Sequence, residues 1–351
     1  MNKLKMSKTN RVNFATYGMV ILAYIVLQVM GNAGMLSSTM KGQLVPICAY
    51  VAMALSLNLT VGVLGELSLG HAGFMSVGAF AGAVAAAALP IPSDGQRLAA
   101  AMVIGAIAAA VMGTLVGIPV LRLNGDYLAI VTLAFGQIIK SIVENLYIGM
   151  DTQGLRFSFL ENRIVFKDGG RMILNAAMGV NGIQKISTFT AGFILIMFIL
   201  IVIFNLVGSR AGRAIMALRD NRIAAESVGV PVTKYKLMAF VISAAMAGAA
   251  GTLFALGQNT ITANKFDFNT SILILVFVVL GGQGNMWGSI LAAAFLTILP
   301  ETPAMRGLAD YRMLIYAVIL ILVMLATNNP TVQDFINANF RKKKKKEGAA
   351  K

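Results

Sequence analysis

The chain has 351 residues, of which 58% are hydrophobic and only 12% are charged. Soluble domains carry about twice that charged share, so a soluble protein of this composition would expose far too much apolar surface. The formal net charge of +15 would suggest a nucleic-acid partner in a soluble protein, but not in a chain that lies mostly in lipid. The apolar runs are long and unbroken, which also excludes the alternating strands of an outer-membrane barrel.

Successive apolar runs predict a series of membrane-spanning helices. Eight runs are long enough for a full crossing, near residues 14–31, 43–63, 72–89, 98–121, 127–147, 189–207, 237–257 and 309–326. Two shorter runs lie near 269–282 and 285–299. The first of these gives ~21 Å of helix, less than the ~30 Å hydrocarbon core. We expect an all-α, polytopic membrane helix bundle of about ten transmembrane helices, two of them short or broken. The alternative is eight crossings with a re-entrant hairpin over 269–299.

Basic residues gather in three places, and their placement orients the chain. They precede the first span, fill the 208–236 loop and close the chain, as Lys3, Lys5, Lys8, Arg11; Arg210, Arg213, Arg219, Arg222, Lys234, Lys236; and Arg341 with Lys342 to Lys346. Cytoplasmic loops carry such an excess of Lys and Arg. We therefore expect both termini and the 208–236 loop in the cytoplasm.

This orientation puts the polar 148–188 segment outside, as a small periplasmic cap that includes a short amphipathic helix. The membrane domain then covers residues 1–336, and a basic cytoplasmic tail covers 337–351. The basic start and the first apolar run are expected to be an uncleaved span rather than a signal peptide.

Glycines mark two expected interruptions of the helices. The first follows the second span, where Gly65 and Gly70 flank Glu66 and Ser68, and His71 comes next; the second is the turn formed by Gly281, Gly282, Gln283, Gly284 and Asn285. A half-helix end would suit the charged group of a zwitterion, so the first interruption either lines a pathway or is a turn at the cytoplasmic end. One histidine and one cysteine, Cys48, allow no two-His site and no Cys cluster, so no metal site is expected.

The fifth span carries a polar face. Gln137, Lys140 and Glu144 follow i, i+3, i+7 spacing, and Lys140 and Glu144 are placed to form an ion pair. Charged residues inside a span are costly and face the bundle interior or water. The face is therefore either part of a pathway or a structural pair near the external interface.

The 208–236 loop predicts a short cytoplasmic helix. Ser209 is a fitting N-cap, the following sequence is rich in Ala, and Gly229 ends the helix. Such a short helix needs a docking partner. With Ile215, Leu218 and Ala225 on one side, it either sits in a groove of a cytoplasmic protein or is a basic loop on anionic lipid.

Four ordered motifs resemble the Liv-type permeases, the permease family of branched-chain amino acid ABC transporters. The stretch Ala224-Ala225-Glu226-Ser227-Val228-Gly229 looks like the coupling-loop motif of ABC importer permeases, although the family's plain order is Glu-Ala-Ala. The other motifs lie at 65–74, 126–136 and 279–288, and the resemblance spans roughly residues 43–326. At Gln137 and Lys140 the family usually has an acidic residue and an arginine.

The resemblance implies a permease subunit that moves branched-chain amino acids across the bacterial inner membrane. Its implied partners are a related permease subunit, two ABC ATPase subunits that bind ATP and Mg, and a periplasmic substrate-binding protein. Residues implied in ATPase coupling are Gly212, Arg213, Arg219, Ala224, Ala225, Glu226 and Gly229. Candidates for the translocation pathway are Glu66, Ser68, His71, Tyr127, Thr132, Gln137, Lys140 and Glu144.

The chain lacks the phosphate-binding loop of ATPases and any recognisable catalytic set, so we expect a transport subunit without a cofactor or enzyme activity of its own. Two rivals remain: a Liv-type permease for urea or short amides, and a self-contained secondary transporter. A secondary transporter would need paired buried carboxylates, and only Glu144 is placed inside a span.

Overall fold

The computed structural model describes residues 8–121, 126–151, 154–160, 170–301, 311, 314–318 and 321–322. The chain divides into two compact units, residues 1–298 and 299–351. In the second unit, η4 (Leu299–Glu301) is a 3₁₀ turn, and residues 314–318 and 321–322 are helical. Most of the expected span 309–326 and the whole 337–351 tail lie outside the described residues.

The described part of the chain holds eight helical segments that are long and apolar enough to cross a membrane. They contain α1 (Lys8–Asn32), α2 (Ser38–Asn58), α3 (His71–Ala88), α4 (Asp94–Val120), α5 (Asp126–Glu144), α6 (Phe189–Gly208), α9 (Val232–Ala255) and α10 (Phe268–Gly281). A shorter apolar helix, α11 (Met286–Ile298), follows α10. The prediction of an all-α, multi-pass membrane protein is confirmed.

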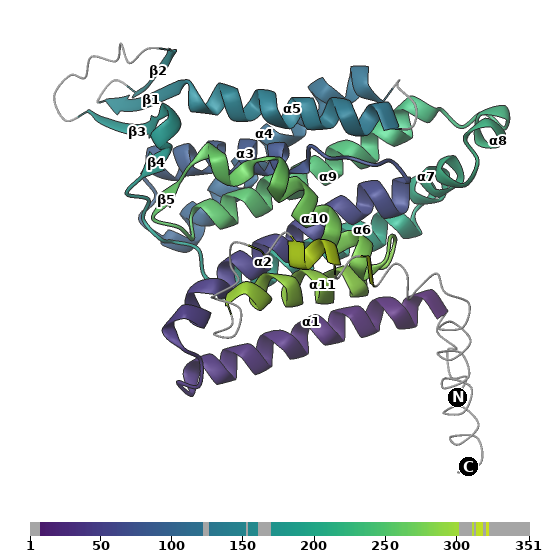
Figure 1. Ribbon diagram of the computed structural model, residues 1–351, viewed down its shortest axis with the longest axis horizontal. Coiled ribbons are helices and arrows are strands. Elements are labelled where there is room, and N and C mark those ends of the chain that lie inside the picture. Colours follow the sequence, from purple (N-terminus) through teal and green to yellow (C-terminus); the bar gives the residue numbers. More distant parts are fainter. Residues whose placement is uncertain are drawn as a thin grey trace. The chain divides into compact units, whose positions relative to one another are not determined.

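The centre of the first unit is built from α2, α3, α4 and α9, and the helices run side by side in Figure 1. In the apolar 18-residue stretch of each helix, 94% of the residues are buried for α2 and 11% for α1. Small residues bring α3 and α9 together, because Gly78 lies against the backbone of Gly248. Thr252 Oγ1 of α9 then donates to Gly78 O at 2.8 Å. Close backbone approach at small residues is the usual basis of helix packing in membranes.

Replacing Gly78 with alanine should destabilise this core. The added Cβ would meet the Gly248 backbone, which has no flexible end to move aside. Overpacking of this kind costs about 1–3 kcal/mol, so we expect a lower thermal unfolding temperature in detergent. Gly18→Ala is the control, since nothing lies within 4 Å of its added Cβ. Equal stability of the two variants would contradict the tight α3–α9 contact.

A five-stranded antiparallel sheet covers one end of the bundle, in the order β2-β1-β3-β4-β5. Its strands are β1 (Leu146–Asp151), β2 (Gly154–Phe159), β3 (Arg171–Asn175), β4 (Val180–Asn181) and β5 (Thr260–Ile261). The expected amphipathic helix is wrong for the described residues, where the helical turn is the 3₁₀ segment η2 (Ala176–Met178). The strands β1 and β2 form a local hairpin, whereas β5, which is distant in sequence, joins the sheet by pairing with β4.

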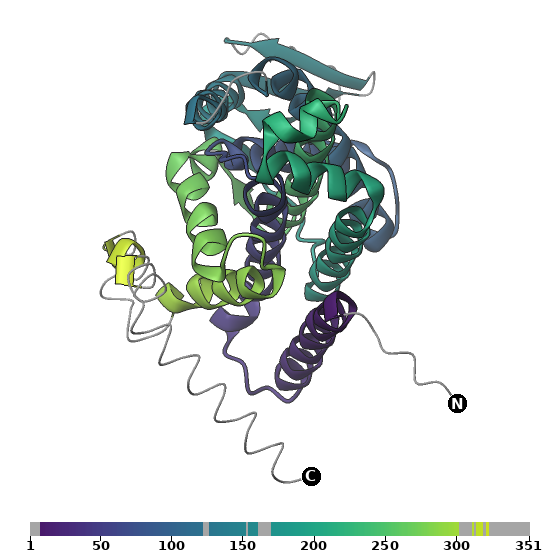
Figure 2. The ribbon, with the colours of Figure 1, turned by 90° about the vertical axis from the view of Figure 1, so that its right-hand side faces the viewer.

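The opposite end of the bundle carries α7 (Arg210–Asp220) and α8 (Arg222–Ser227). Figure 2 looks onto this end. We call it the basic end, and the other the sheet end. The helix α1 also starts at this end, with Lys8 (Figure 1).

The two short runs form a pair of packed helices. The helix α10 begins just after β5 and η3 (Ala263–Phe266), at the sheet end. Its last residue, Gly281, packs against the backbone of Gly288 and Ser289 at the start of α11. The turn between them lies at the basic end, against the segment that follows α2. This arrangement agrees with two short crossings rather than a hairpin that enters and leaves on one side.

Candidate functional site

The break after α2 is the centre of the candidate site. The helix continues from Asn58 into a π-helical turn, η1 (Leu59–Leu64), and ends at Gly65 with φ of +79°. Glycine adopts this left-handed conformation without the strain that a side chain would add. The chain then runs without regular structure to Gly70, and α3 starts at His71. A π-helical turn inside a buried span is a common mark of a functional position.

The helix α7 is fastened to this break by one arginine. Arg219 Nη1 donates to Gly62 O of η1 at 2.9 Å. The Arg219 side chain also fills the place where a Cβ of Gly65 would lie. Its other donors, Nε and Nη2, bond to Asp220 Oδ1 at 3.0 and 2.9 Å. The guanidinium therefore bridges α7 to a backbone carbonyl that the π-helical turn presents.

The turn between α10 and α11 is fastened to the same break from another side. Asn58 is fully buried. Its Nδ2 donates to Ser289 Oγ at 2.8 Å, and its Oδ1 accepts from Gly284 N at 2.7 Å. Gly62 lies directly against Gly284, with no room for a Cβ. Through these contacts α7, η1 and the α10–α11 turn form one connected structure, which we call the break junction.

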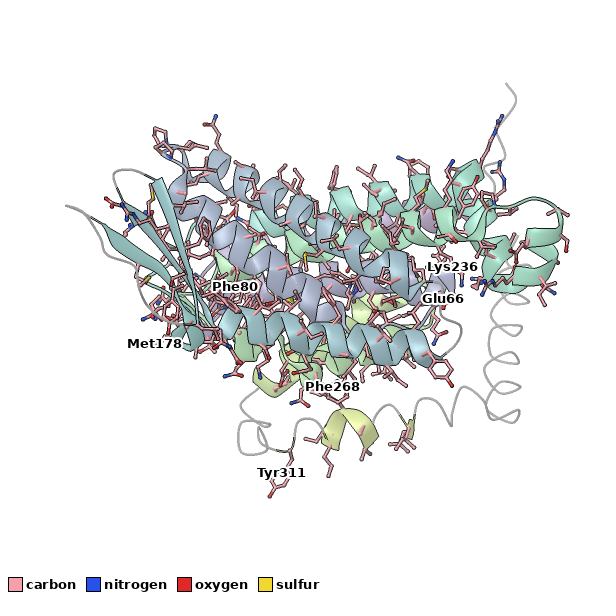
Figure 3. The ribbon with its side chains drawn as sticks, turned by 90° about the horizontal axis from the view of Figure 1, so that it is seen from above. Glu66, Phe80, Met178, Lys236, Phe268 and Tyr311 are labelled. Atoms are coloured by element: carbon pink, nitrogen blue, oxygen red, sulfur yellow. The ribbon has the colours of Figure 1, made fainter. Side chains whose placement is uncertain are left out.

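A buried ion pair holds the other side of the break. Glu66 Oε1 and Lys236 Nζ of α9 are in direct contact, with only 14% and 6% of their side chains exposed. Figure 3 shows the two side chains pointing toward each other near the basic end. A buried charge of this kind requires its partner, because removing either one leaves the other uncompensated. The pair therefore ties the segment after Gly65 to α9.

His71 belongs to a cluster of hydroxyl side chains at the start of α3. The histidine is 2% exposed, and its Nε2 lies 2.7 Å from Ser56 Oγ. Ser243 Oγ of α9 donates to Ser56 O. Ser271 Oγ of α10 accepts from Ala72 N, a free backbone donor of the first turn of α3, at 3.1 Å. Four helices thus meet at His71 through polar contacts, and no metal-binding group of His, Cys, Asp or Glu is found in the described residues.

The hydroxyl groups around the break differ in whether they have partners. Thr132 of α5 is fully buried, accepts from Leu69 N at 3.1 Å and donates to Ala129 O at 3.0 Å. Ser68 Oγ and Thr60 Oγ1 are buried and have no hydrogen-bond partner among the described residues. Buried hydroxyl groups normally have a hydrogen-bond partner. A polar ligand that passed the break could supply the partner that these two groups lack.

The remaining residues of the α5 face lie apart from the break junction. Lys140 Nζ and Glu144 Oε1 are 3.8 Å apart, with 23% and 28% of their side chains exposed. Glu144 is the last residue of α5, just before β1, so this pair lies toward the sheet end. Gln137 is half-buried beside an open hollow shared with Phe159. Tyr127 is 69% exposed, at the other end of the helix.

The loop after α6 differs from its prediction in two ways. The N-cap is confirmed, because Gly212 N donates to Ser209 Oγ at 3.1 Å. A single helix up to Gly229 is wrong, since Asn221 interrupts it and caps α8 by accepting from Ala224 N.

The expected docking side of this loop is also wrong. Ile215, Leu218 and Ala225 are buried inside the chain, where Leu218 and Ala225 pack with Val232 of α9. Among the residues implied in coupling, Gly212 and Ala225 are buried, and Arg213, Arg219, Ala224, Glu226 and Gly229 are exposed. The apolar side chains that α8 and the next residue do present are Ile223 and Val228, which are 78% and 80% exposed.

Two buried polar side chains at the break, those of Asn58 and Lys236, were not identified as such by the sequence analysis. Asn58 is a lone amide at the end of an apolar run, and a polar side chain inside a span is a usable signal. Lys236 was counted with the exposed Arg and Lys residues of the basic loop, although its own side chain is buried. Its partner Glu66 lies 170 residues away in sequence.

Comparisons with known proteins show which family this chain resembles. A family model described as branched-chain amino acid transport system / permease component matches residues 39–324. The permease proteins LivM of the high-affinity branched-chain amino acid transport systems of Salmonella typhimurium and Escherichia coli strain K12 are each 36% identical over 286 residues. That alignment covers 79% of this chain and 66%, slightly under two thirds, of each relative. The permease protein LivH of Escherichia coli strain K12 is 26% identical over 287 residues, 79% of this chain and 88% of the relative. No solved structure matches the chain.

Proposed function

Since the chain belongs to the permease family of branched-chain amino acid transport systems, we propose that it is the membrane subunit of an ATP-binding-cassette importer for branched-chain amino acids. The substrate is inferred from the names of the two LivM relatives. The membrane would be the bacterial inner membrane, with the basic end in the cytoplasm as its Lys and Arg residues favour.

The observation that carries the proposal is the break junction. The helix α7 at the basic end bonds to the π-helical turn of α2 through Arg219 and Gly62. Asn58 links that turn to α10 and α11. A push on α7 from outside the chain would therefore reach the interrupted helices inside the bundle. This is the connection that a permease needs when an external motor provides the energy.

The proposed partners follow from this connection. Two ABC ATPase subunits would bind ATP and Mg and dock on α7 and α8, and a periplasmic binding protein would deliver the substrate at the sheet end. A related permease would complete the pathway, as the presence of both LivM and LivH among the relatives suggests. This chain would need no cofactor of its own.

The pathway is proposed to pass the break. Glu66, Ser68, His71 and Thr132 all lie at or beside it, and Ser68 Oγ is unpartnered in the described residues. Lys140, Glu144 and Gln137 lie toward the sheet end of α5, where a role at the entrance is the proposal. Tyr127 is placed at an exposed surface, where a neighbouring permease chain would reach it.

The docking of ATPase subunits can be tested with one charge. Ile223→Asp places a carboxylate at an exposed apolar position of α8, where burial against a partner would leave the charge unpaired. We expect at least a tenfold loss of ATPase subunits that copurify with the tagged permease, and the same for Val228→Asp. Met178→Asp is the matched control, since Met178 is 62% exposed at the sheet end (Figure 3). Copurification at the level of the unchanged protein in both the Ile223 and the Val228 variants would overturn the proposal.

The transport assay also separates the two rivals. Proteoliposomes that contain the assembled complex should take up leucine only with ATP. Uptake by the purified chain alone, driven by an ion gradient, would instead identify a secondary transporter. ATP-driven uptake of urea without leucine would leave the importer class in place and replace the substrate.

A further inference from the structure

A cavity of about 750 Å³ opens at the basic end, between α1, α6, the start of α7 and the α10–α11 turn. Its body is apolar and aromatic, with Phe14 and Tyr17 from α1, Phe204 from α6, and Met286 and Trp287 from α11. Trp287 is 43% exposed and Phe14 is 65% exposed. An aromatic, water-accessible cavity at the end of a span is a typical place for an amphiphile, because Trp and Tyr rings prefer the membrane interface.

The mouth of the same cavity favours negative charge. The described residues that line it include no acidic side chain, and Arg210 directly follows the lining residues Gly208 and Ser209. Arg213 Nη1 donates to Gly208 O at 3.2 Å, so its guanidinium lies at the rim. Ser209, the N-cap of α7, and Met286, the first residue of α11, also line the cavity, and helix N-termini attract anions.

Amide groups complete the mouth. Asn13, Asn205 and Asn285 all line the cavity, and each amide offers two N–H donors to a phosphate or glycerol oxygen. The cavity thus combines a basic, donor-rich mouth with an apolar body, which is the chemistry of an anionic headgroup joined to acyl chains.

We propose that this cavity binds one anionic phospholipid from the leaflet at the basic end. The phosphate lies near Arg213 and the start of α7, and an acyl chain lies along Phe204 and Trp287. The lipid fills the space between α1, which precedes the family-matched residues 39–324, and the helices α6 and α11. Through Gly284, which lines both the cavity and the break junction, the lipid contacts the segment that would move during transport.

The fluorescence of Trp287 reports directly on this site, because Trp287 is the single tryptophan of the chain. The full-length protein is reconstituted in nanodiscs of phosphatidylcholine with an increasing fraction of brominated phosphatidylglycerol, and quenching of tryptophan fluorescence is measured. The same series is run with brominated phosphatidylcholine. One arginine near an anionic lipid is worth roughly fivefold in binding. We therefore expect brominated phosphatidylglycerol to reach half-maximal quenching at a lipid fraction at least roughly fivefold lower than brominated phosphatidylcholine does.

Arg213→Gln should reduce the preference for phosphatidylglycerol roughly fivefold. At a high fraction of either brominated lipid, the variant should still show tryptophan quenching. Arg210→Gln tests the same mouth if the first variant does not fold, with folding checked by an unchanged emission maximum. Lys234→Gln is the matched control, since it removes the same charge at the basic end from α9, a helix that contributes no residue to the cavity lining. The control should keep the full preference.

Two results would overturn the proposal. One is equal quenching by the two brominated lipids in the unchanged protein, which would mean ordinary annular lipid. The other is loss of quenching in the assembled transporter with its partner permease, which would mean that a protein chain occupies the cavity. Neither result depends on whether the complex transports amino acids.

Discussion

Replacing Lys236 with methionine should lower the free energy of unfolding by about 3–5 kcal/mol, because Glu66 would remain buried without its partner. Only 14% of the Glu66 side chain is exposed, and its Oε1 contacts Lys236 directly. Methionine keeps the length of the lysine stem, so the loss reports the charge rather than a cavity. The measurement is equilibrium unfolding of the purified protein in detergent micelles.

The matched control for this prediction is Lys234→Met, two residues earlier on the same helix. Lys234 is exposed, so its substitution should change stability by less than about 0.5 kcal/mol. Adding Glu66→Gln to Lys236→Met should restore most of the lost stability, since the uncompensated charge is then gone. A double variant as unstable as Lys236→Met alone would show that the charge is not the cause.

Replacing Gly62 with alanine should reduce transport at least tenfold while the complex still assembles. The new Cβ would meet both Asn58 Oδ1 and Gly284 N, which are the two atoms of the hydrogen bond that joins η1 to the α10–α11 turn. The turn would have to move away from the break, and the connection from α7 to the interrupted helices would be lost. The readouts are ATP-driven uptake in proteoliposomes and copurification of the ATPase subunits.

The control for Gly62→Ala is Gly42→Ala on the same helix, where nothing lies within 4 Å of an added Cβ. It should keep both transport and assembly. Normal uptake by Gly62→Ala would remove the break junction from the transport mechanism. Joint loss of uptake and ATPase subunits would make it a folding element instead.

Several elements were predictable because their causes are local. The spans follow from apolar runs whose length matches a bilayer, and the described helices agree with nine of the ten expected runs. Ser209 was predictable as a cap, since its hydroxyl accepts from Gly212 N only three residues away. The ion pair of Lys140 and Glu144 was predictable from one turn of helix.

Contacts that are distant in sequence account for part of the errors. The strand β5 joins the sheet by pairing with β4, about eighty residues earlier in the chain, whereas the hairpin of β1 and β2 in the same sheet is local and was not predicted either. The docking side of the loop was misplaced because Val232 of the next helix buries Leu218 and Ala225. An amphipathic pattern shows which side of a helix is apolar, but not whether that side faces the same chain or a partner.

The sequence alone therefore determined that this is a membrane-embedded helical protein with a basic end, because hydropathy and charge act over one helix at a time. Only the tertiary structure decided which buried polar groups meet. Asn58 and Gly284 are separated by 226 residues, and Glu66 and Lys236 by 170. A buried polar group needs a partner, but the chain does not state which one; the close approach of helices at small residues such as Gly62 decides it.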